Sequence, residues 1–217
     1  MSANLETLYG VKYLEPGTSA VVESPETDAY SYVTYLGKYS VNVENGDSAW
    51  IVENGGKQAR VAKGPTVVES AVWTTVIRGY RTEEKSVGLN TNTVLPYVNG
   101  CSTKQVFPPD RSGDPTLQLL KIPPFSSEQA HHIHSTVRVV YVLDGWGYSI
   151  VGMNGHVVKK KLVPGMLVVL DKMCPHHFET EDSWLTVVPL HVFSALPKGI
   201  ENDHPMFNGT FLMNQGG

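Results

Sequence analysis

Hydrophobic and polar residues alternate along most of the chain, in short segments separated by turns rich in glycine, proline and asparagine. In the first half, the segments 31–43, 49–53 and 71–77 have this character and are rich in valine, threonine and aromatic residues. A two-residue period is typical of strands with one buried face. Helix signals are weak, with room for a turn or two in the first dozen residues and after Ala195. The pattern therefore predicts an all-β protein.

The alternation becomes denser from Leu117 onward. Strands are predicted at 117–122, 130–134, 138–143, 148–151, 156–162, 166–170, 178–181 and 185–193. The turn Asp144-Gly145-Trp146-Gly147 predicts that the third and fourth of these strands pair as a hairpin. Short strands at this regular spacing favour a closed barrel or a jelly roll over a parallel sheet.

Two histidines of one predicted strand, His132 and His134, lie two positions apart, and His176 follows 42 residues later. Side chains at positions i and i+2 of a strand face the same side. A third histidine from another strand of that sheet would complete one face of a metal site. Imidazole binds zinc, iron, copper and nickel, so the residue types leave the metal open. The alternative is that these are ordinary strand histidines that hydrogen-bond inside a polar barrel.

Composition narrows the functional classes. The chain has 217 residues, of which 41% are hydrophobic, which is enough to bury a core. A net charge of -4 and a pI near 6.0 give no electrostatic reason to expect a nucleic acid or an anionic membrane as partner. No apolar run approaches the roughly 20 residues of a membrane helix. The N-terminus lacks signal-peptide features, and Cys101 and Cys174 form no disulfide framework, so we expect a cytoplasmic protein.

Two motifs frame the histidines. The first runs from His132-Ile133-His134 through three residues to Arg138, and through six more to Gly145. The second runs from Gly165 through a proline-containing turn to His176. In this order and at this spacing, the motifs resemble those of the cupin superfamily.

The resemblance implies a cupin-type double-stranded β-helix, which is a jelly-roll barrel, over residues 95–195. We therefore expect an N-terminal β extension at 1–94, this barrel, and a C-terminal tail at 196–217. The extension is either a degenerate barrel half packed on the main barrel or a dimerisation element, and cupins commonly form homodimers through such strands. The family spacing also favours His176 over His177 as the third metal ligand.

Three departures from the family pattern bear on the chemistry. Arg138 stands where cupins usually carry a glutamate ligand, the glycine ahead of the paired histidines is missing, and the usual Pro-X-Gly turn reads Asp171-Lys172-Met173. A guanidinium cannot ligate a cation. The site therefore either holds its metal with three histidines alone, or holds no metal and binds an anion through Arg138.

Other polar residues are expected near these ligands. Arg138 shares the parity of His132 and His134, so it should point inward, where it would clamp a substrate carboxylate or pair internally with Glu128, Asp171 or Glu179. His191 is a candidate fourth ligand, hydrogen-bond partner or general base, or else an ordinary wall residue. Strand alternation sends His131 and His177 to the opposite face.

The leading hypothesis is a metal-dependent enzyme, a dioxygenase or lyase that acts on a small organic acid. His132, His134 and His176 would hold a divalent metal, with ferrous iron first and nickel, manganese or zinc as alternatives, which resembles the dioxygenase sites of the superfamily. Arg138 would neutralise the substrate carboxylate and His191 would move protons. The alternatives are a non-catalytic barrel that binds an anion or a sugar, and a metal-independent sugar isomerase.

Overall fold

The computed structural model describes residues 4–24, 31–70, 72–111, 113–192 and 210–211. The chain divides into two compact units, one of residues 1–13 and 91–217 and the other of residues 14–90. The secondary structure of the described residues is nearly all β, which confirms the predicted all-β class. The predicted tail at 196–217 lies outside the described residues, except for 210–211.

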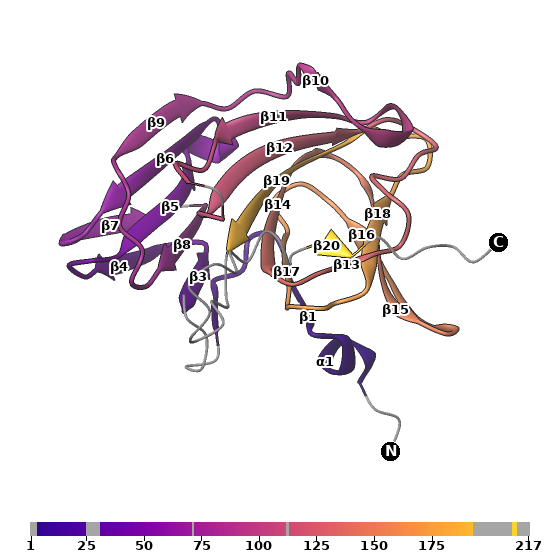
Figure 1. Cartoon of the computed structure of the whole chain (residues 1–217), viewed down its shortest axis with the longest axis horizontal. Coiled ribbons are helices and arrows are strands. Elements are labelled where there is room, and N and C mark those ends of the chain that lie inside the picture. The colour runs from indigo at the N-terminus through magenta and orange to yellow at the C-terminus, as the bar shows by residue number, and fades with distance from the viewer. Residues whose placement is uncertain (1–3, 25–30, 71, 112, 193–209, 212–217) are drawn as a thin grey trace. The chain divides into compact units, whose positions relative to one another are not determined.

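The first unit contains two main sheets (Figure 1). The larger has seven strands in the order β1-β17-β14-β19-β12-β11-β10, and the smaller has three in the order β16-β15-β18. A short ribbon of β13 and β20 and the helix α1 complete the unit. The bounds are α1 Leu5–Tyr9, β1 Val11–Leu14, β10 Leu95–Pro96, η2 Val98–Gly100, β11 Ser102–Phe107, β12 Thr116–Ile122, β13 Ile133–His134, β14 Val137–Gly145, β15 Gly147–Met153, β16 His156–Leu162, β17 Leu167–Leu170, β18 His176–Glu179, β19 Leu185–Val192 and β20 Thr210–Phe211.

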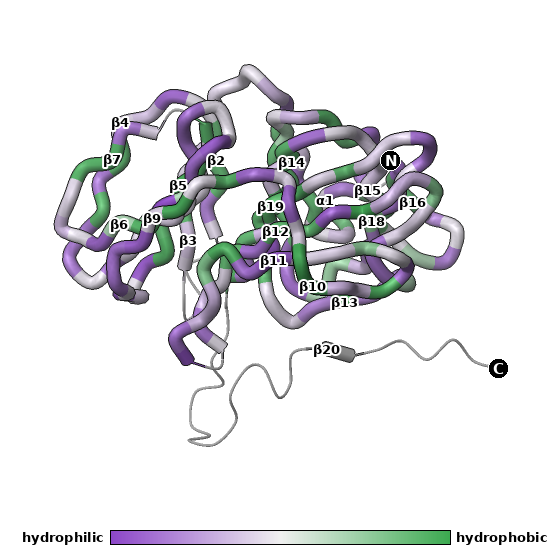
Figure 2. The backbone as a smooth tube through the Cα atoms, turned by 90° about the horizontal axis from the view of Figure 1, so that it is seen from above, coloured by the Kyte–Doolittle hydropathy of each residue, from purple (hydrophilic) through white to green (hydrophobic). Residues whose placement is uncertain are grey.

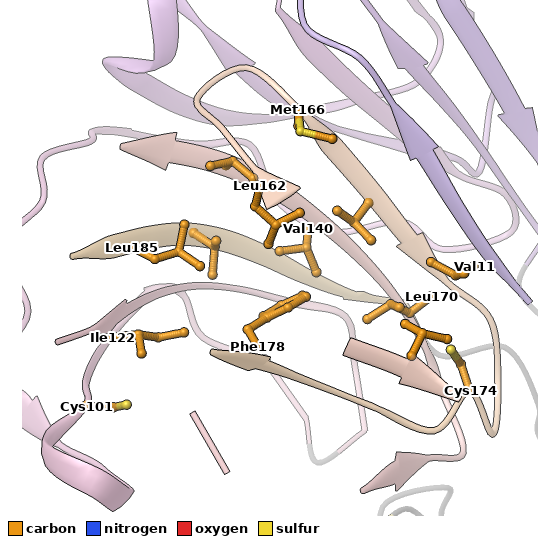
Figure 3. Close-up of a cluster of buried hydrophobic side chains, with 14 residues drawn as sticks. Val11, Cys101, Ile122, Val140, Leu162, Met166, Leu170, Cys174, Phe178 and Leu185 are labelled. Carbon is orange, nitrogen blue, oxygen red and sulfur yellow. The ribbon is translucent and has the colours of Figure 1, made fainter. Parts of the chain in front are cut away.

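A cluster of buried apolar side chains joins the two sheets of this unit. In Figure 3, Phe178 of β18 lies among side chains of the larger sheet such as Val140 and Leu170. Figure 2 shows hydrophobic residues gathered along β14 and β19, the two central strands of that sheet. Burial of this apolar surface is the main force that holds the sheets together. The buried members are Val11, Cys101, Ile122, Val140, Val142, Val151, Leu162, Met166, Val168, Leu170, Cys174, Phe178, Leu185 and Val187.

The predicted hairpin between β14 and β15 is wrong. β14 pairs with β17 and β19, whereas β15 pairs with β16 and β18. The chain leaves the larger sheet at Gly145, which has a φ of 73°. A β carbon at Gly145 would lie 1.8 Å from the carbonyl oxygen of Trp184. The turn is therefore a crossing between two sheets, and glycine is required there because the neighbouring backbone leaves no room for a side chain.

The second unit has its own sheet and its own core. Six strands pair in the order β2-β3-β8-β5-β6-β9, and β4 and β7 form a separate ribbon. The core cluster comprises Val41, Val43, Ala49, Ile51, Ala62, Val68 and Val76. The bounds are β2 Ala20–Glu23, β3 Tyr32–Leu36, β4 Tyr39–Val43, β5 Ser48–Glu53, η1 Asn54–Gly56, β6 Gln58–Lys63, β7 Thr66–Ser70, β8 Trp73–Ile77 and β9 Lys85–Gly88.

Helical structure is scarce. The helix α1 has five residues, with Asn4 as its N-cap. Within the described ranges, no helix is both long and apolar enough to cross a membrane.

Candidate metal centre

Backbone pairing brings His132 and His176 face to face. The two residues form an isolated antiparallel bridge, in which each amide donates to the other carbonyl at 3.1 and 2.9 Å. Residues directly opposite in such a pair project their side chains to the same face. His134 lies two residues further along and returns to that face. One ring nitrogen from each of the three histidines lies within 4.8 Å of the others.

Hydrogen bonds fix the tautomers of two of these rings. His132 Nδ1 lies 2.8 Å from the carbonyl oxygen of Ala130, and His176 Nδ1 lies 2.8 Å from that of Cys174. Because a carbonyl oxygen only accepts, each Nδ1 must carry the proton, and each Nε2 keeps its lone pair. Metal-binding histidines are commonly oriented in this way by a carbonyl behind the ring.

The third ring completes the donor set. His134 Nε2 lies 2.9 Å from His132 Nε2, so these two nitrogens face each other. Because His132 Nε2 has no proton, His134 Nε2 donates in this contact, and His134 Nδ1 is buried without a hydrogen-bond partner within the described ranges. A neutral, nitrogen-only donor set of this kind suits zinc, iron, nickel or copper. The residues present therefore fit a divalent metal.

Burial keeps the three imidazoles neutral. It lowers the pKa of His176 to about 3, with the neighbouring His132 as the next cause. Burial also lowers the pKa of His132 and of His134, and the positive charge of Arg138 acts in the same direction on all three. Neutral imidazole is the form that binds metals. At neutral pH the site therefore needs to release no proton before a metal binds.

A cavity of about 640 Å³ lies over the histidines, which form part of its wall. Six side chains from strands of the two sheets give it an apolar surface: Leu120, Val140, Leu170, Phe178, Val187 and Pro189. A cavity of this size, mainly apolar with a few convergent polar groups, is typical of a small-molecule site.

Three polar residues lie side by side on adjacent strands in the wall of the cavity. Arg138 of β14 lies directly opposite His191 of β19, and His191 lies opposite Thr116 of β12. All three line the cavity. Burial and the positive charge of Arg138 hold the pKa of His191 well below its usual value, so this imidazole is neutral.

Arg138 is half-buried and has no acidic partner among the described residues. Its guanidinium donates to the Thr136 hydroxyl, and none of the predicted ion pairs with Glu128, Asp171 or Glu179 is formed. Burial lowers the pKa of Arg138 to about 9, which leaves the side chain charged at neutral pH. A partly buried charge of this kind calls for an anionic partner.

Two neighbouring histidines lie away from the cavity. His131 Nδ1 and His177 Nδ1 are 2.8 Å apart, and His131 Nε2 lies 2.7 Å from the carbonyl oxygen of Gly152. Cys174 belongs to the core cluster, where burial raises the pKa of its thiol to about 12. It is a buried apolar side chain there, and Cys101 and Cys174 are both free.

Two residues of the cavity wall are not among the predicted site residues, although Glu128 is one of the predicted ion-pair partners of Arg138. Glu128 lines the cavity and is 5% exposed, and Tyr97 lines it and accepts a hydrogen bond from Gln129. Glu128 precedes the paired histidines by four positions, outside both motifs. The one signal that could have found it is its closeness in sequence to His132.

The structure of this chain is similar to several solved protein structures. No family model matches the sequence, and no curated protein matches it. A cupin 2 conserved barrel domain protein from Leptotrichia buccalis is 15% identical, with 82% of this chain and 91% of that chain covered and a TM-score of 0.45. The 7S globulin of Momordica charantia is 10% identical, with 84% of each chain covered and a TM-score of 0.49. The polyketide cyclase RemF from Streptomyces resistomycificus is 16% identical, with 52% and 80% covered and a TM-score of 0.38.

None of these similarities assigns a reaction to this chain. The homodimer and the cytoplasmic location stay predictions. The described residues confirm the all-β class, and the resemblance to the cupin superfamily stays the one that the two sequence motifs predict.

Proposed function

We propose that this chain is a metal-dependent enzyme, a dioxygenase or lyase, whose substrate is a small organic acid. One observation carries the proposal: three neutral imidazoles converge in a cavity that also contains a half-buried arginine with no acidic partner among the described residues. Both features line one cavity of about 640 Å³. A purely structural role would explain neither the convergence nor the unpaired charge.

His132, His134 and His176 would hold the metal. Three protein ligands leave positions open for water and substrate, as catalytic sites require. A bound divalent metal supplies Lewis-acid chemistry, and ferrous iron adds the ability to react with oxygen. The chain's contribution is to keep the three rings neutral and two of them aligned, through the carbonyls of Ala130 and Cys174.

Arg138 would bind and orient the substrate carboxylate. A guanidinium presents paired donors that match a carboxylate in two parallel hydrogen bonds. The low-dielectric wall around Arg138 strengthens this contact compared with one in water. The residue therefore selects for acids and sets the substrate's position relative to the histidines.

His191 would act as a fixed hydrogen-bonding group beside Arg138. Its strongly lowered pKa makes it a weak base, so holding a substrate oxygen suits it better than storing a proton. His191 lies directly opposite Arg138 on the neighbouring strand, so both side chains line the same part of the cavity wall. Together they would hydrogen-bond to the carboxylate group of the substrate.

The decisive experiment measures metal content. Protein purified without an affinity tag is analysed by inductively coupled plasma mass spectrometry, for the wild type, His176→Ala and His156→Ala. We expect about one metal ion per chain in the wild type and in His156→Ala, because His156 is exposed on the β15–β16 hairpin. His176→Ala should lose the metal and keep its β-sheet circular dichroism. Full metal content in folded His176→Ala would rule out the proposed centre.

Oxygen consumption then separates the two reaction classes. The ferrous protein is mixed with a panel of small aromatic and aliphatic acids in an oxygen electrode. Uptake that depends on the acid and is absent in His176→Ala supports a dioxygenase. Turnover of an acid without oxygen uptake, with iron or with zinc bound, supports a lyase. A metal-free wild type that also refuses added ferrous iron would favour the alternative of an anion- or sugar-binding barrel.

A further inference from the structure

Glu128 presents a carboxyl group in the cavity wall that the metal centre does not use. Its side chain is 5% exposed and lies on the segment between β12 and β13. Its Oε2 atom is buried and has no hydrogen-bond partner within the described ranges. The metal-binding group comprises His132, His134 and His176 and does not include it.

The fold satisfies the Glu128 carboxyl group only in part, because the Phe178 backbone hydrogen-bonds to it while its Oε2 atom has no partner within the described ranges. The Glu128 backbone amide donates to the Phe178 carbonyl at 3.1 Å, and any residue other than proline would supply that bond. No lysine or arginine of the described residues forms an ion pair with Glu128, including Arg138, which lines the same cavity. A buried polar atom without a partner costs stability, and glutamate is almost never fully buried unless paired. Such a group calls for a functional explanation.

Tyr97 lines the same cavity as Glu128 and Arg138. The Tyr97 side chain accepts a hydrogen bond from Gln129. Burial is the largest cause of the raised pKa of this tyrosine, the charge of Glu128 raises it further, and that of Arg138 lowers it. The Tyr97 ring therefore lies within electrostatic reach of both Glu128 and Arg138. One ligand in the cavity can contact a cation at one end and a carboxyl group at another.

We propose that Glu128 is a specificity-determining contact for a hydroxyl group of the ligand, so that the substrate class is a small hydroxy acid. The proposal rests on the proposed function, since it assumes that Arg138 takes the carboxylate. A hydroxyl group both donates and accepts, so it pairs with a carboxyl group whether that group is protonated or ionised. An ammonium group is the less suitable partner, because Arg138 and a bound metal ion place positive charge in the same cavity.

Hydroxylated aromatic acids are the appropriate probes. The cavity has an apolar wall that includes Val140, Phe178 and Val187, which suits a ring. Benzoate carries the carboxylate alone, and 2-, 3- and 4-hydroxybenzoate each add one hydroxyl at a different distance. Binding of the four acids is measured by titration calorimetry, on zinc-loaded and on metal-stripped protein. The second condition separates a contact with Glu128 from chelation of the metal by 2-hydroxybenzoate.

The wild type should bind at least one hydroxybenzoate roughly tenfold more tightly than benzoate, as expected for one well-placed hydrogen bond in a buried site. Glu128→Ala should lose this preference while its affinity for benzoate stays within about threefold of the wild type. Glu128→Gln keeps a donor and an acceptor of the same length and should retain part of the preference. If Glu128→Ala fails to fold, Glu128→Leu takes its place.

The outcomes separate this inference from the proposed function. A preference that survives in Glu128→Ala or Glu128→Leu, or a wild type that prefers no hydroxybenzoate to benzoate, overturns the role of Glu128 and leaves Arg138 untouched. Loss of all four acids in Arg138→Met, with the hydroxyl preference confined to proteins that carry Glu128, supports both. A wild type that binds none of the four acids overturns the carboxylate site and this inference with it.

Discussion

At the scale of single residues, Arg138 is the clearest case of a side chain that costs folding stability and so calls for a functional explanation. Its side chain is half-buried, and the described residues offer its guanidinium the Thr136 hydroxyl and no carboxylate. A cation in this setting is desolvated without the compensation of an ion pair. Its presence is best explained by a ligand that supplies the missing negative charge.

Replacing Arg138 by methionine tests this explanation. Methionine has similar length and no charge, so we expect benzoate to bind roughly 10- to 100-fold more weakly, since hydrogen bonds to charged groups contribute about 1.5–3 kcal/mol. The free energy of unfolding in urea should be unchanged or higher, because a partly buried, uncompensated charge has been removed. Lys57→Met, at an exposed lysine of the second unit, controls for the loss of one positive charge. Equal benzoate affinities in Arg138→Met and Lys57→Met would contradict the assignment.

Glu128 gives the protein a pH-dependent stability of predictable sign. Burial raises the pKa of this carboxyl from 4.5 to about 8. The folded state therefore holds the proton more tightly than the unfolded state does. The resulting stabilisation is fully present below about pH 4.5 and is lost as the pH rises through about 8. The buried histidines, whose pKa values are lowered, act in the opposite direction below about pH 6.5.

A comparison of wild type with Glu128→Gln isolates the Glu128 contribution. Glutamine has no proton to lose, so its advantage in unfolding free energy over the wild type should grow between pH 4.5 and 8, by an amount on the order of 3–5 kcal/mol. Urea unfolding in the presence of EDTA, followed by circular dichroism at several pH values, measures the difference. A difference that stays constant across this window would show that the carboxyl group is not desolvated.

At the scale of elements, the alternation of residues locates strands well and their partners poorly. The predicted strands 117–122, 138–143 and 185–193 agree with β12, β14 and β19 to within two residues, because these strands carry strongly apolar faces. Alternation describes which face a residue occupies and says nothing of the neighbouring strand. The glycines of the 144–147 turn are typical of hairpins, so the local pattern predicts a hairpin where the chain crosses between sheets.

The candidate site is predictable to the same extent. The i and i+2 histidines share a face because of strand geometry, which acts over two residues. The His132–His176 bridge needs the family spacing as well, since it joins positions far apart in sequence. Glu128 has neither kind of signal. Its backbone amide bonds to the carbonyl of Phe178, which lies fifty positions away in the sequence and comes close only in the fold.

Gly145 tests the crossing between the sheets. Its φ of 73° and the Trp184 carbonyl oxygen, 1.8 Å from the position of an added β carbon, predict that Gly145→Ala costs more than about 3 kcal/mol of unfolding free energy. Gly155 is a matched control, with a φ of 80° and no atom within 4 Å of an added β carbon. Gly155→Ala should cost about 1–2 kcal/mol from the backbone conformation alone. Equal costs for the two variants, measured by urea unfolding, would exclude the close contact at Gly145.

At the scale of the whole molecule, the chain is organised as a unit interrupted by another. α1 and β1 belong with residues 91–217, and residues 14–90 form the second unit. The sequence predicts one boundary at residue 94, because the family resemblance begins at residue 95. The pairing of β1 with β17 has no local signal in the sequence. Whether the second unit serves the barrel as a degenerate half or as a dimerisation element stays a prediction.

Metal binding should stabilise the first unit against unfolding and leave the stability of the second unit unchanged. A ligand that binds only the folded state stabilises it by about 2.7 kcal/mol at a hundred times its dissociation constant. His132, His134 and His176 all belong to the first unit, so zinc should slow amide exchange in β14 and β19 and leave β5 and β8 of the second unit unchanged. Hydrogen–deuterium exchange mass spectrometry on the intact chain, with and without zinc, reads both units in one experiment. His176→Ala should abolish the difference. Equal protection of β14 and β5 by zinc would instead show that the two units unfold as a single cooperative body.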